Sequence, residues 1–384
     1  MNLALFLIAI PLVGLLYAYV GYPLILLLLA ALRRETASRH SEWTWPSISV
    51  CIPVYNEEAS IGAKLTQLVA SDYPANRQVL VISDASTDGT DEIVRGFADR
   101  GVELLRQPER RGKTAAENAA TALITGDIVV NTDATIIIPP PSLKALVRAF
   151  ADPTVGVASG RDISVGADGT EANRGESGYV SYEMSVRSLE TRVGSIVGAS
   201  GCFFAIRRDL HRIPVPPQLS RDFASALIAR ENGYRSVSVN DAVCLVPRTG
   251  SLSIEFRRKV RTMARGLDTL RHWRHLLNPL RHGGFAWMLF SHKLCRWLVP
   301  VFFPVALAGL GILSFYWPPA TVAFGSVILA AALGWLALRW PEGKRLPRPV
   351  AWCGYLLSAN LAAILAWSQV LRGDTNPIWE PTRR

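Results

Sequence analysis

The stretch of sequence that decides the fold is SISVCIPVYNEE, residues 47–58. It opens with an apolar run and closes on polar residues directly before an amphipathic helical pattern at Ser60–Ala70. An apolar run that ends in polar residues and leads into a helix is typical of a strand-to-helix unit. The alternation continues, with strands expected at Ser47–Pro53, Gln78–Ser83, Val102–Arg106 and Asp127–Asn131 and further helices at Thr90–Arg100 and Lys113–Thr125. We therefore expect an α/β fold with a mostly parallel sheet and helices on both faces.

Polar and acidic side chains gather where three of these strands end. The clusters are PVYNEE at 53–58, SDASTDGT at 83–90 and NTDAT at 131–135. Each cluster alone could be helix capping, because Asp, Asn and Ser are preferred at helix N-termini. Ligands of open α/β sheets, however, bind beyond the carboxyl ends of the strands. Together the three clusters predict one binding site at this edge of the sheet.

The two ends of the chain are far more apolar than its middle. Hydrophobic residues make up 49% of the 384 residues and charged residues only 19%. The excess lies in Leu3–Leu32 and in three later runs, Leu298–Trp317, Thr321–Leu338 and Val350–Leu371. About 20 apolar residues span a bilayer as a helix. We expect a membrane helix at 1–32, an α/β domain at 46–250, basic interface helices at 251–292, about three membrane helices at 298–371 and a tail at 372–384.

The formal net charge is +10, and the basic residues lie beside the apolar runs, at 33–39, 257–281 and 344–348. This placement indicates membrane lipids as the partner rather than nucleic acid, for which the chain has no binding motif. The positive-inside rule places the middle domain in the cytosol. We therefore expect a multi-pass protein of the inner, cytoplasmic membrane. The side of the C-terminus stays open, because three later spans place it outside whereas its arginines favour the inside.

Other nucleotide-binding classes fit less well. Gly112-Lys113-Thr114 opens a helix like a phosphate-binding P-loop, but Gln107 stands where that motif needs glycine. No GxGxxG follows a strand, so a dinucleotide-binding fold is unsupported. The five cysteines form no CxxC pair, which indicates free thiols in a reducing compartment.

Four motifs, in this order and spacing, resemble the inverting family 2 glycosyltransferases with the GT-A fold. They are PVYNEE (53–58), SDASTDGT (83–90), RRGKTAAEN (110–118) and TDAT (132–135). The resemblance covers Ser47 to about Gly266. The flanking apolar runs resemble the polysaccharide-synthase branch, with its poly-N-acetylglucosamine, hyaluronan and cellulose synthases. It implies a GT-A-like domain that takes a sugar from a nucleotide sugar, expected here to be a UDP-sugar.

The resemblance also implies roles for the residues that match the motifs. Asp133 would be the first acid of a DxD motif that holds a divalent metal, Mg²⁺ or Mn²⁺, on the donor diphosphate. Thr135 stands where the second acid is expected, and its neutral hydroxyl is a weaker metal ligand. The implied donor-binding residues are Pro53, Tyr55, Asn56, Glu57, Asp84, Lys113, Asp133 and Arg261, the last being all that matches a Gln-x-x-Arg-Trp motif.

On the acceptor side, Gly201 and Cys202 lie in GASGCFF (198–204), which resembles the family's acceptor loop. Asp222 matches the catalytic base of a Glu-Asp pair, and Arg221 stands where the family has the Glu. A base is needed because an acceptor hydroxyl must lose its proton as it attacks the anomeric carbon. The missing tryptophan after Arg261 leaves processive polymer synthesis in doubt.

The sequence thus predicts an inverting, metal-assisted membrane glycosyltransferase that acts on a lipid-linked or growing polysaccharide acceptor. One alternative is the addition of a single sugar to a lipid carrier. Another is a nucleotide-binding membrane regulator that has lost catalysis, an idea that Thr135 and Arg221 keep open. The sugar, its linkage and the oligomeric state are not predicted.

Overall fold

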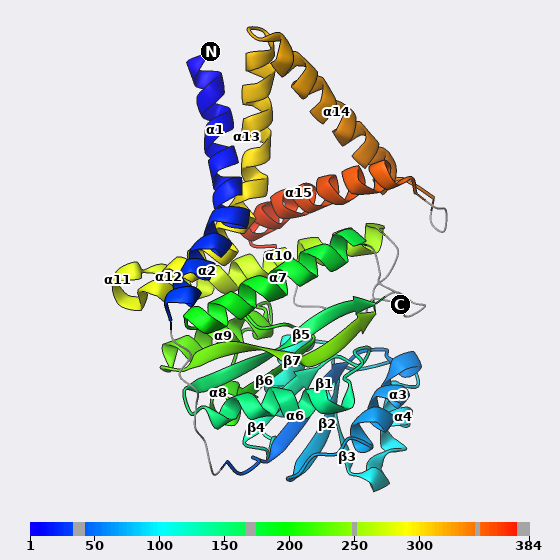
Figure 1. Cartoon of the computed structure of the whole chain (residues 1–384). Coiled ribbons are helices and arrows are strands. Elements are labelled where there is room, and N and C mark those ends of the chain that lie inside the picture. Colours follow the sequence, from blue (N-terminus) through cyan, green and yellow to red (C-terminus); the bar gives the residue numbers. More distant parts are fainter. Residues whose placement is uncertain (34–42, 166–173, 248–251, 342–345, 375–384) are drawn as a thin grey trace. The chain divides into compact units, whose positions relative to one another are not determined.

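The computed structural model describes residues 1–33, 43–165, 174–247, 252–341 and 346–374 (Figure 1). The chain divides into two compact units. A helical unit takes in residues 1–28 and the described residues from 252 to 374, and a sheet unit takes in the described residues from 29 to 247. Each unit is described by itself. The basic residues at 34–39 and 344–345 and the tail from 375 onward lie outside the described residues.

The sheet unit is built on a seven-stranded sheet in the order β3-β2-β1-β4-β6-β5-β7. Strand β6 runs antiparallel to both of its neighbours, β4 and β5, and the remaining pairings are parallel. The sheet is therefore mostly parallel, as predicted. The strands are β1 (Ile48–Val54), β2 (Arg77–Ser83), β3 (Val102–Arg106), β4 (Ile128–Thr132), β5 (Val155–Val165), β6 (Phe203–Arg207) and β7 (Arg235–Pro247).

Helices cover both faces of this sheet. Successive strand residues point to opposite faces, so each strand packs against helices on both sides. On one face, Val50 and Ile52 of β1 pack with Ile61 and Leu65 of α3 in a continuous apolar core. On the other face, the Cys51 thiol is close enough to Glu117 of α5 for that carboxylate to raise its pKa, second to burial. The helices are α3 (Glu58–Val69), α4 (Thr90–Arg95), α5 (Lys113–Ala120), α6 (Pro140–Arg148), α7 (Arg174–Val193), α8 (Arg208–His211) and α9 (Arg221–Glu231).

The predicted elements are found with small shifts at their ends. Strand β3 has the predicted bounds, whereas β1 and β4 each lie one residue later than expected. The helix predicted at Thr90–Arg100 is α4 followed by a 3₁₀ turn at Ala98–Arg100, which ends at Gly101 with a φ of 79°. Helix α5 ends at Ala120, short of the predicted Thr125. Gly126 follows it, and a Cβ there would lie 2.3 Å from the backbone of β1.

The helical unit contains four helices long and apolar enough to cross a membrane, by length and composition. The first runs from Asn2 to Leu32 and consists of α1 (Asn2–Leu16), a π-helical turn and α2 (Tyr22–Leu32). The second begins at Gly284, earlier than the expected Leu298, and continues through α12 (Gly284–Leu289) and a π-helical turn into α13 (Arg296–Ser314). The last two are α14 (Pro318–Leu338) and α15 (Arg348–Arg372).

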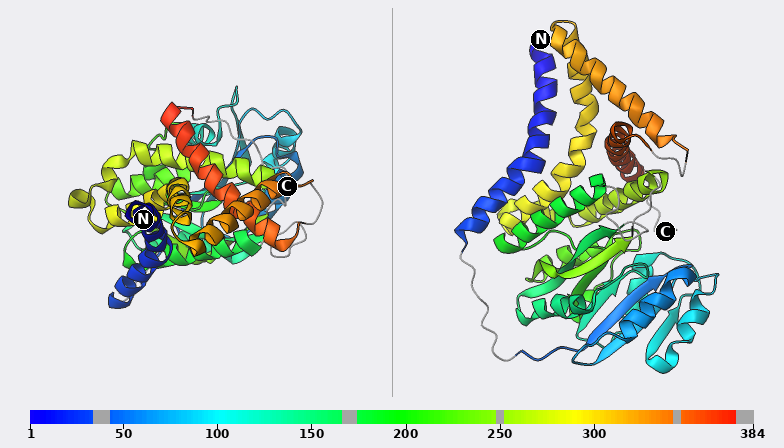
Figure 2. Two further views of the ribbon diagram at one scale, coloured as in Figure 1. Left: turned by 90° about the horizontal axis from the view of Figure 1, so that it is seen from above. Right: turned by 45° about the vertical axis from the view of Figure 1, so that its right-hand side comes forward.

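Two pairs of helices pack together within this unit, and one of them includes the expected interface segment. Helices α1 and α13 run side by side in both views (Figures 1 and 2). The basic helix α10 (Leu252–His272) is amphipathic, and its Ala264 and Leu267 pack on Ala366 and Val370 of α15. The segment expected to reach His292 as interface helices instead consists of α10, two short helical turns and the start of the second long apolar helix. Gly283, at a φ of 54°, lies directly before that last helix.

Candidate functional site

The loops after β1 and β2 are tied to each other by hydrogen bonds. Asn56, at a φ of 52°, accepts a hydrogen bond from the Thr87 backbone N–H at 2.8 Å through its side-chain oxygen. The backbone N–H of Glu57 donates to the Thr90 hydroxyl at 2.8 Å, and the Glu57 carboxylate accepts from Ser60. A residue other than glycine at a positive φ is uncommon, and Asn tolerates it best. The PVYNEE and SDASTDGT motifs therefore form one structure at the end of the sheet.

Asp84, at the end of β2, determines where α5 begins. Its buried carboxylate accepts hydrogen bonds from the backbone N–H groups of Arg111 and Gly112, each at 2.8 Å. Gly112 has a φ of 91°, which glycine adopts at little cost. Lys113 follows as the first residue of α5. The donor contact predicted for Asp84 stays a prediction, because in the structure this carboxylate holds the loop that presents Lys113.

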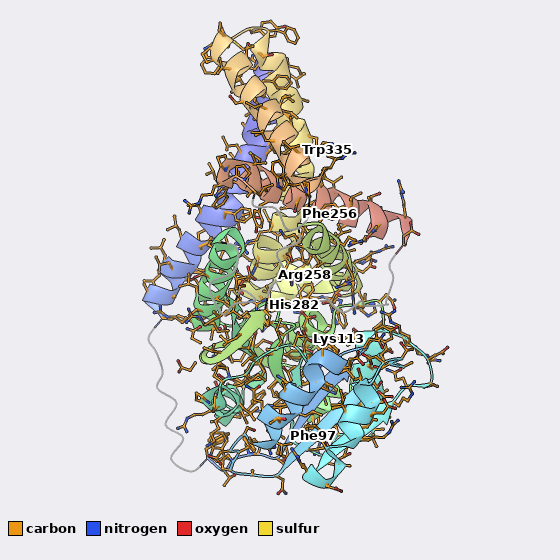
Figure 3. The ribbon with its side chains drawn as sticks, turned by 90° about the vertical axis from the view of Figure 1, so that its right-hand side faces the viewer. Phe97, Lys113, Phe256, Arg258, His282 and Trp335 are labelled. Carbon is orange, nitrogen blue, oxygen red and sulfur yellow. The ribbon has the colours of Figure 1, made fainter. Side chains whose placement is uncertain are left out.

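Lys113, labelled in Figure 3, joins three loops at one point. Its ammonium donates to Asp133 Oδ1 at 2.5 Å and to the Gly201 carbonyl at 3.1 Å. Burial lowers the pKa of Lys113, but the carboxylates of Asp133, Glu117 and Asp222 outweigh it and raise the pKa above its ordinary value. The lysine is therefore charged at every physiological pH, and donor phosphates would meet a permanent cation.

Asp222 lies close enough to the Lys113 ammonium to raise its pKa. Its Oδ1 accepts a hydrogen bond from the Ser220 hydroxyl at 2.5 Å, which fixes the carboxylate at the start of α9. Its Oδ2 would lie 3.0 Å from a Cβ added to Gly201, so only glycine leaves this approach open. Lys113, Asp133, Gly201 and Asp222 thus form one cluster, and the roles predicted for them stay predictions.

The remaining predicted residues divide between the two units. Pro53 is a buried residue of β1. Tyr55 lies just beyond this strand, and the Arg110 guanidinium stacks on its ring, 3.7 Å from the ring centroid. The backbone N–H of Cys202 donates to Ser200, whose hydroxyl bonds Asp162. Arg261 belongs to α10 of the helical unit, the helix that also contains Arg258, which Figure 3 labels. Its donor role stays a prediction.

Lys64 is a site residue that no motif singles out. Its ammonium donates to the Thr132 hydroxyl at 3.2 Å and to the Ile136 carbonyl at 2.7 Å, so it spans the Asp133–Thr135 segment. It also lines a cavity of about 250 Å³ together with Thr135. Burial lowers its pKa to about 7. The signal in the sequence is a lysine on the apolar stripe of α3, among Ile61, Leu65 and Leu68.

The comparison with protein families decides what kind of domain holds this cluster. Residues 49–213 match Glycosyl transferase family 2. These residues form a glycosyl transferase family 2 domain. The match includes Asp84, Lys113 and Asp133 and ends before Asp222.

Two curated relatives match this family 2 domain. An N-acetylglucosaminyltransferase from Rhizobium sp. (strain N33) is 26% identical over 240 residues, which cover 56% of this chain and 52% of the relative. An undecaprenyl-phosphate 4-deoxy-4-formamido-L-arabinose transferase from Aeromonas hydrophila is 31% identical over 203 residues, 49% of this chain and 59% of the relative. The chain thus spans about half the length of these curated relatives.

A solved structure resembles the chain over nearly its whole length. It is a mannosyltransferase from Pyrobaculum calidifontis, in complex with GDP-Man and Mn²⁺. The two are 25% identical with a TM-score of 0.70, and the match covers 95% of this chain and 99% of the mannosyltransferase. The sheet unit has the GT-A-like fold that the motifs predicted.

The family 2 domain offers few metal ligands of its own. Within the part of the chain that the structure describes, no three His, Cys, Asp or Glu side chains gather to hold an ion. Mg²⁺ in phosphate-transfer sites takes one or two carboxylates and completes its shell with substrate phosphates and water. The Asp133 carboxylate, with Thr135 two residues on, fits a site of that kind. Such a site would be completed by the donor's own diphosphate.

The buried ammonium of Lys64 makes the stability of the family 2 domain depend on pH. Its pKa is about 7 in the folded protein and 10.5 ordinarily, so the unfolded chain binds more protons between these values. Stability therefore rises with pH across that window. We expect Lys64→Met to remove this contribution, so that its melting temperature gains most over wild type at pH 6 and least at pH 9. A difference that does not change with pH between 6 and 9 would contradict the lowered pKa.

Proposed function

We propose that the protein is an inverting membrane glycosyltransferase that moves a sugar from a nucleotide-sugar donor to an acceptor at the membrane. The observation that carries the proposal is the cluster of Lys113, Asp133 and Gly201, within the residues that match family 2, with Asp222 just beyond them. It supplies a fixed cation for a diphosphate, an acid for a metal and a second acid for a proton. The names of the relatives, an N-acetylglucosaminyltransferase and an undecaprenyl-phosphate transferase, support this reading.

In the proposed reaction, an acceptor hydroxyl oxygen forms a bond to the anomeric carbon while the bond from that carbon to the diphosphate breaks. Attack from the opposite side inverts the configuration. The hydroxyl proton passes to Asp222, whose Oδ2 faces the open side left by Gly201. Lys113 stabilises the negative charge of the departing nucleoside diphosphate. A divalent ion held by Asp133 and Thr135 would add charge compensation on the same diphosphate.

Within this function, we also propose a donor nucleotide and an acceptor. We expect a UDP-sugar from the resemblance, whereas the mannosyltransferase was solved with GDP-Man, so a donor panel must contain both nucleotides. A lipid-linked or growing polysaccharide would offer a hydroxyl. The alternative acceptor, a lipid carrier phosphate, would offer an oxygen that is already largely ionised at neutral pH, since phosphate monoesters have a second pKa near 6. Asp222 would then have no proton to remove.

A nucleotide-binding regulator that has lost catalysis is the second candidate function. Thr135 and Arg221 depart from the family pattern and favour it. The hydrogen-bonded approach of Lys113 to Asp133, with Asp222 at Gly201, favours an enzyme. Turnover of the donor by purified protein separates the two, because a regulator would bind nucleotide without consuming it.

Four candidate membrane helices support a multi-pass location. We propose the inner, cytoplasmic membrane with the sheet unit in the cytosol, where nucleotide sugars are made. The exposed Arg33 directly after the first apolar helix supports this orientation through the positive-inside rule.

Asp222→Asn tests the base. The amide oxygen can still accept from Ser220 but the side chain cannot take a proton, so transfer to a hydroxyl should fall about 10²–10⁴-fold. Binding of the nucleoside diphosphate, measured by calorimetry, should change less than about twofold, since the rate loss belongs to the proton transfer. Asp209→Asn, an exposed acid on α8, is the matched control. Transfer above half of the wild-type rate would exclude the base role and favour a phosphate acceptor.

Asp133→Ala and Asp84→Ala separate metal binding from loop support. Asp133→Ala should abolish the gain in nucleoside diphosphate affinity that Mn²⁺ or Mg²⁺ produces. Asp84→Ala should weaken binding with and without metal, because the Arg111 and Gly112 amides lose their acceptor. Titration calorimetry with and without metal measures both. A wild-type metal dependence in Asp133→Ala would show that the ion lies elsewhere.

Impermeant thiol labelling tests the orientation. The background variant lacks the three partly exposed cysteines, Cys202, Cys295 and Cys353. A cysteine at Glu92, whose side chain is 71% exposed, should be labelled only after intact cells are permeabilised. A cysteine at Asn2, expected outside, should be labelled directly. Labelling at position 92 from outside would overturn the cytosolic placement and access to nucleotide sugars.

A further inference from the structure

Arg221 is among the most buried charged residues of the sheet unit. It is 3% exposed and is the first residue of α9, directly before Asp222. Its guanidinium donates to the side-chain oxygen of Asn118 on α5 and to the His211 carbonyl at the end of α8. A planar guanidinium can hold two acceptors in fixed directions, which an acid at this place could not do. The residue that departs from the family's Glu-Asp pair is thus firmly held.

The same face of α5 fastens the whole segment that leads to Asp222. The Asn118 amide donates to the Val215 carbonyl at 2.7 Å, and its oxygen accepts from the Val215 N–H at 3.2 Å. The Thr114 hydroxyl donates to the Leu219 carbonyl at 2.9 Å. Side chains three and four residues apart lie on one helix face, so Thr114 and Asn118 act together. Residues 215–221 therefore rest on the helix that begins with Lys113.

Glu117 places a carboxyl group in this buried region. It is 1% exposed, and neither of its carboxylate oxygens has a hydrogen-bond partner among the described residues. Burial raises the pKa of Glu117, while the charges of Lys113 and Arg221 oppose that rise. Burial likewise lowers the pKa of Arg221, and Glu117 opposes that fall. An acid at position 221 would instead place two carboxylates in one desolvated region, where like charges are costly.

We propose that Arg221 is a positioning residue that sets the location of Asp222 relative to Lys113. It does so by fixing the start of α9 to Asn118 of α5. The absence of the acid from the Glu-Asp pair then does not remove the function, because the hydrogen bonds to α5 hold the segment that carries Asp222. The kinetic consequence rests on the proposed function, whereas the structural consequence does not.

The test compares Arg221→Met and Arg221→Lys in the full-length protein. Arg77 provides the matched control, because its guanidinium also holds backbone carbonyls, those of Ser71 and Val69, but at the start of β2. We expect Arg221→Met to lower kcat about 10–100-fold, as small displacements of a reacting group do, with less than a twofold change in donor affinity. Arg221→Lys should recover part of the loss. Arg77→Met should lower the melting temperature and leave kcat within twofold.

Hydrogen exchange read by mass spectrometry provides the measurement that needs no activity. Arg221→Met should speed exchange in peptides covering residues 211–224 and leave β1 and the first turn of α5 unchanged, whereas Arg77→Met should not affect 211–224. The inference is overturned if exchange in 211–224 stays at the wild-type rate in Arg221→Met. It is also overturned if kcat and donor affinity fall together with the melting temperature in both Arg221→Met and Arg77→Met. Failure of the proposed function would give a different result. The wild-type protein itself would show no transfer, while the exchange difference between wild type and Arg221→Met would persist.

Discussion

The candidate site depends on one cation, the ammonium of Lys113, which lies among carboxylates from different parts of the chain. Asp133 follows β4, Asp222 begins α9 and Glu117 lies one turn further along α5. Without the cation, these acids would repel one another in a region where burial makes charge costly. Asp84 secures the arrangement from the other side by holding the two amides that precede Lys113. The loops at the ends of the strands can therefore stay close together before any donor arrives.

This arrangement bears on the two departures from the family pattern. With Thr135 in place of an acid, the loop after β4 has one fewer negative charge beside the cation, and the buried Lys64 ammonium ties the two ends of that loop. With Arg221 in place of an acid, the start of α9 gains a cation where Glu117 is already buried. Each substitution removes a negative charge from a region that contains a buried ionisable partner. Both departures are consistent with a site that keeps its positive and negative groups close to balance.

The sequence predicted the first half of the sheet well because the signals there are local. Short β-branched runs, polar strand ends and the period of α3 each lie within a few residues, and β1 to β4 were predicted to within about one residue at most ends. Strands β5, β6 and β7 were not predicted. The reversal of β6 depends on pairing with β4 and β5 across large separations in sequence, which no local pattern encodes. The second long apolar helix was predicted at Leu298–Trp317, but its beginning at Gly284 was not, because the residues up to His292 were assigned to the basic interface segment.

For the site, residue types and order predicted which side chains gather, but not what each one holds. Asp84, which is predicted to contact the donor, accepts hydrogen bonds from two backbone amides. Arg221, which keeps a regulator without catalysis open as an alternative, makes two directed hydrogen bonds. Such roles depend on contacts between α5 and the segment before α9, which are separated by about a hundred residues. Because one helix carries both Lys113 and the attachments of that segment, a displacement of α5 would move Lys113 and Asp222 together. A chain that kept nucleotide binding alone would have no need for that linkage, since Lys113 and Asp133, the residues proposed for the donor side, are joined to each other without it.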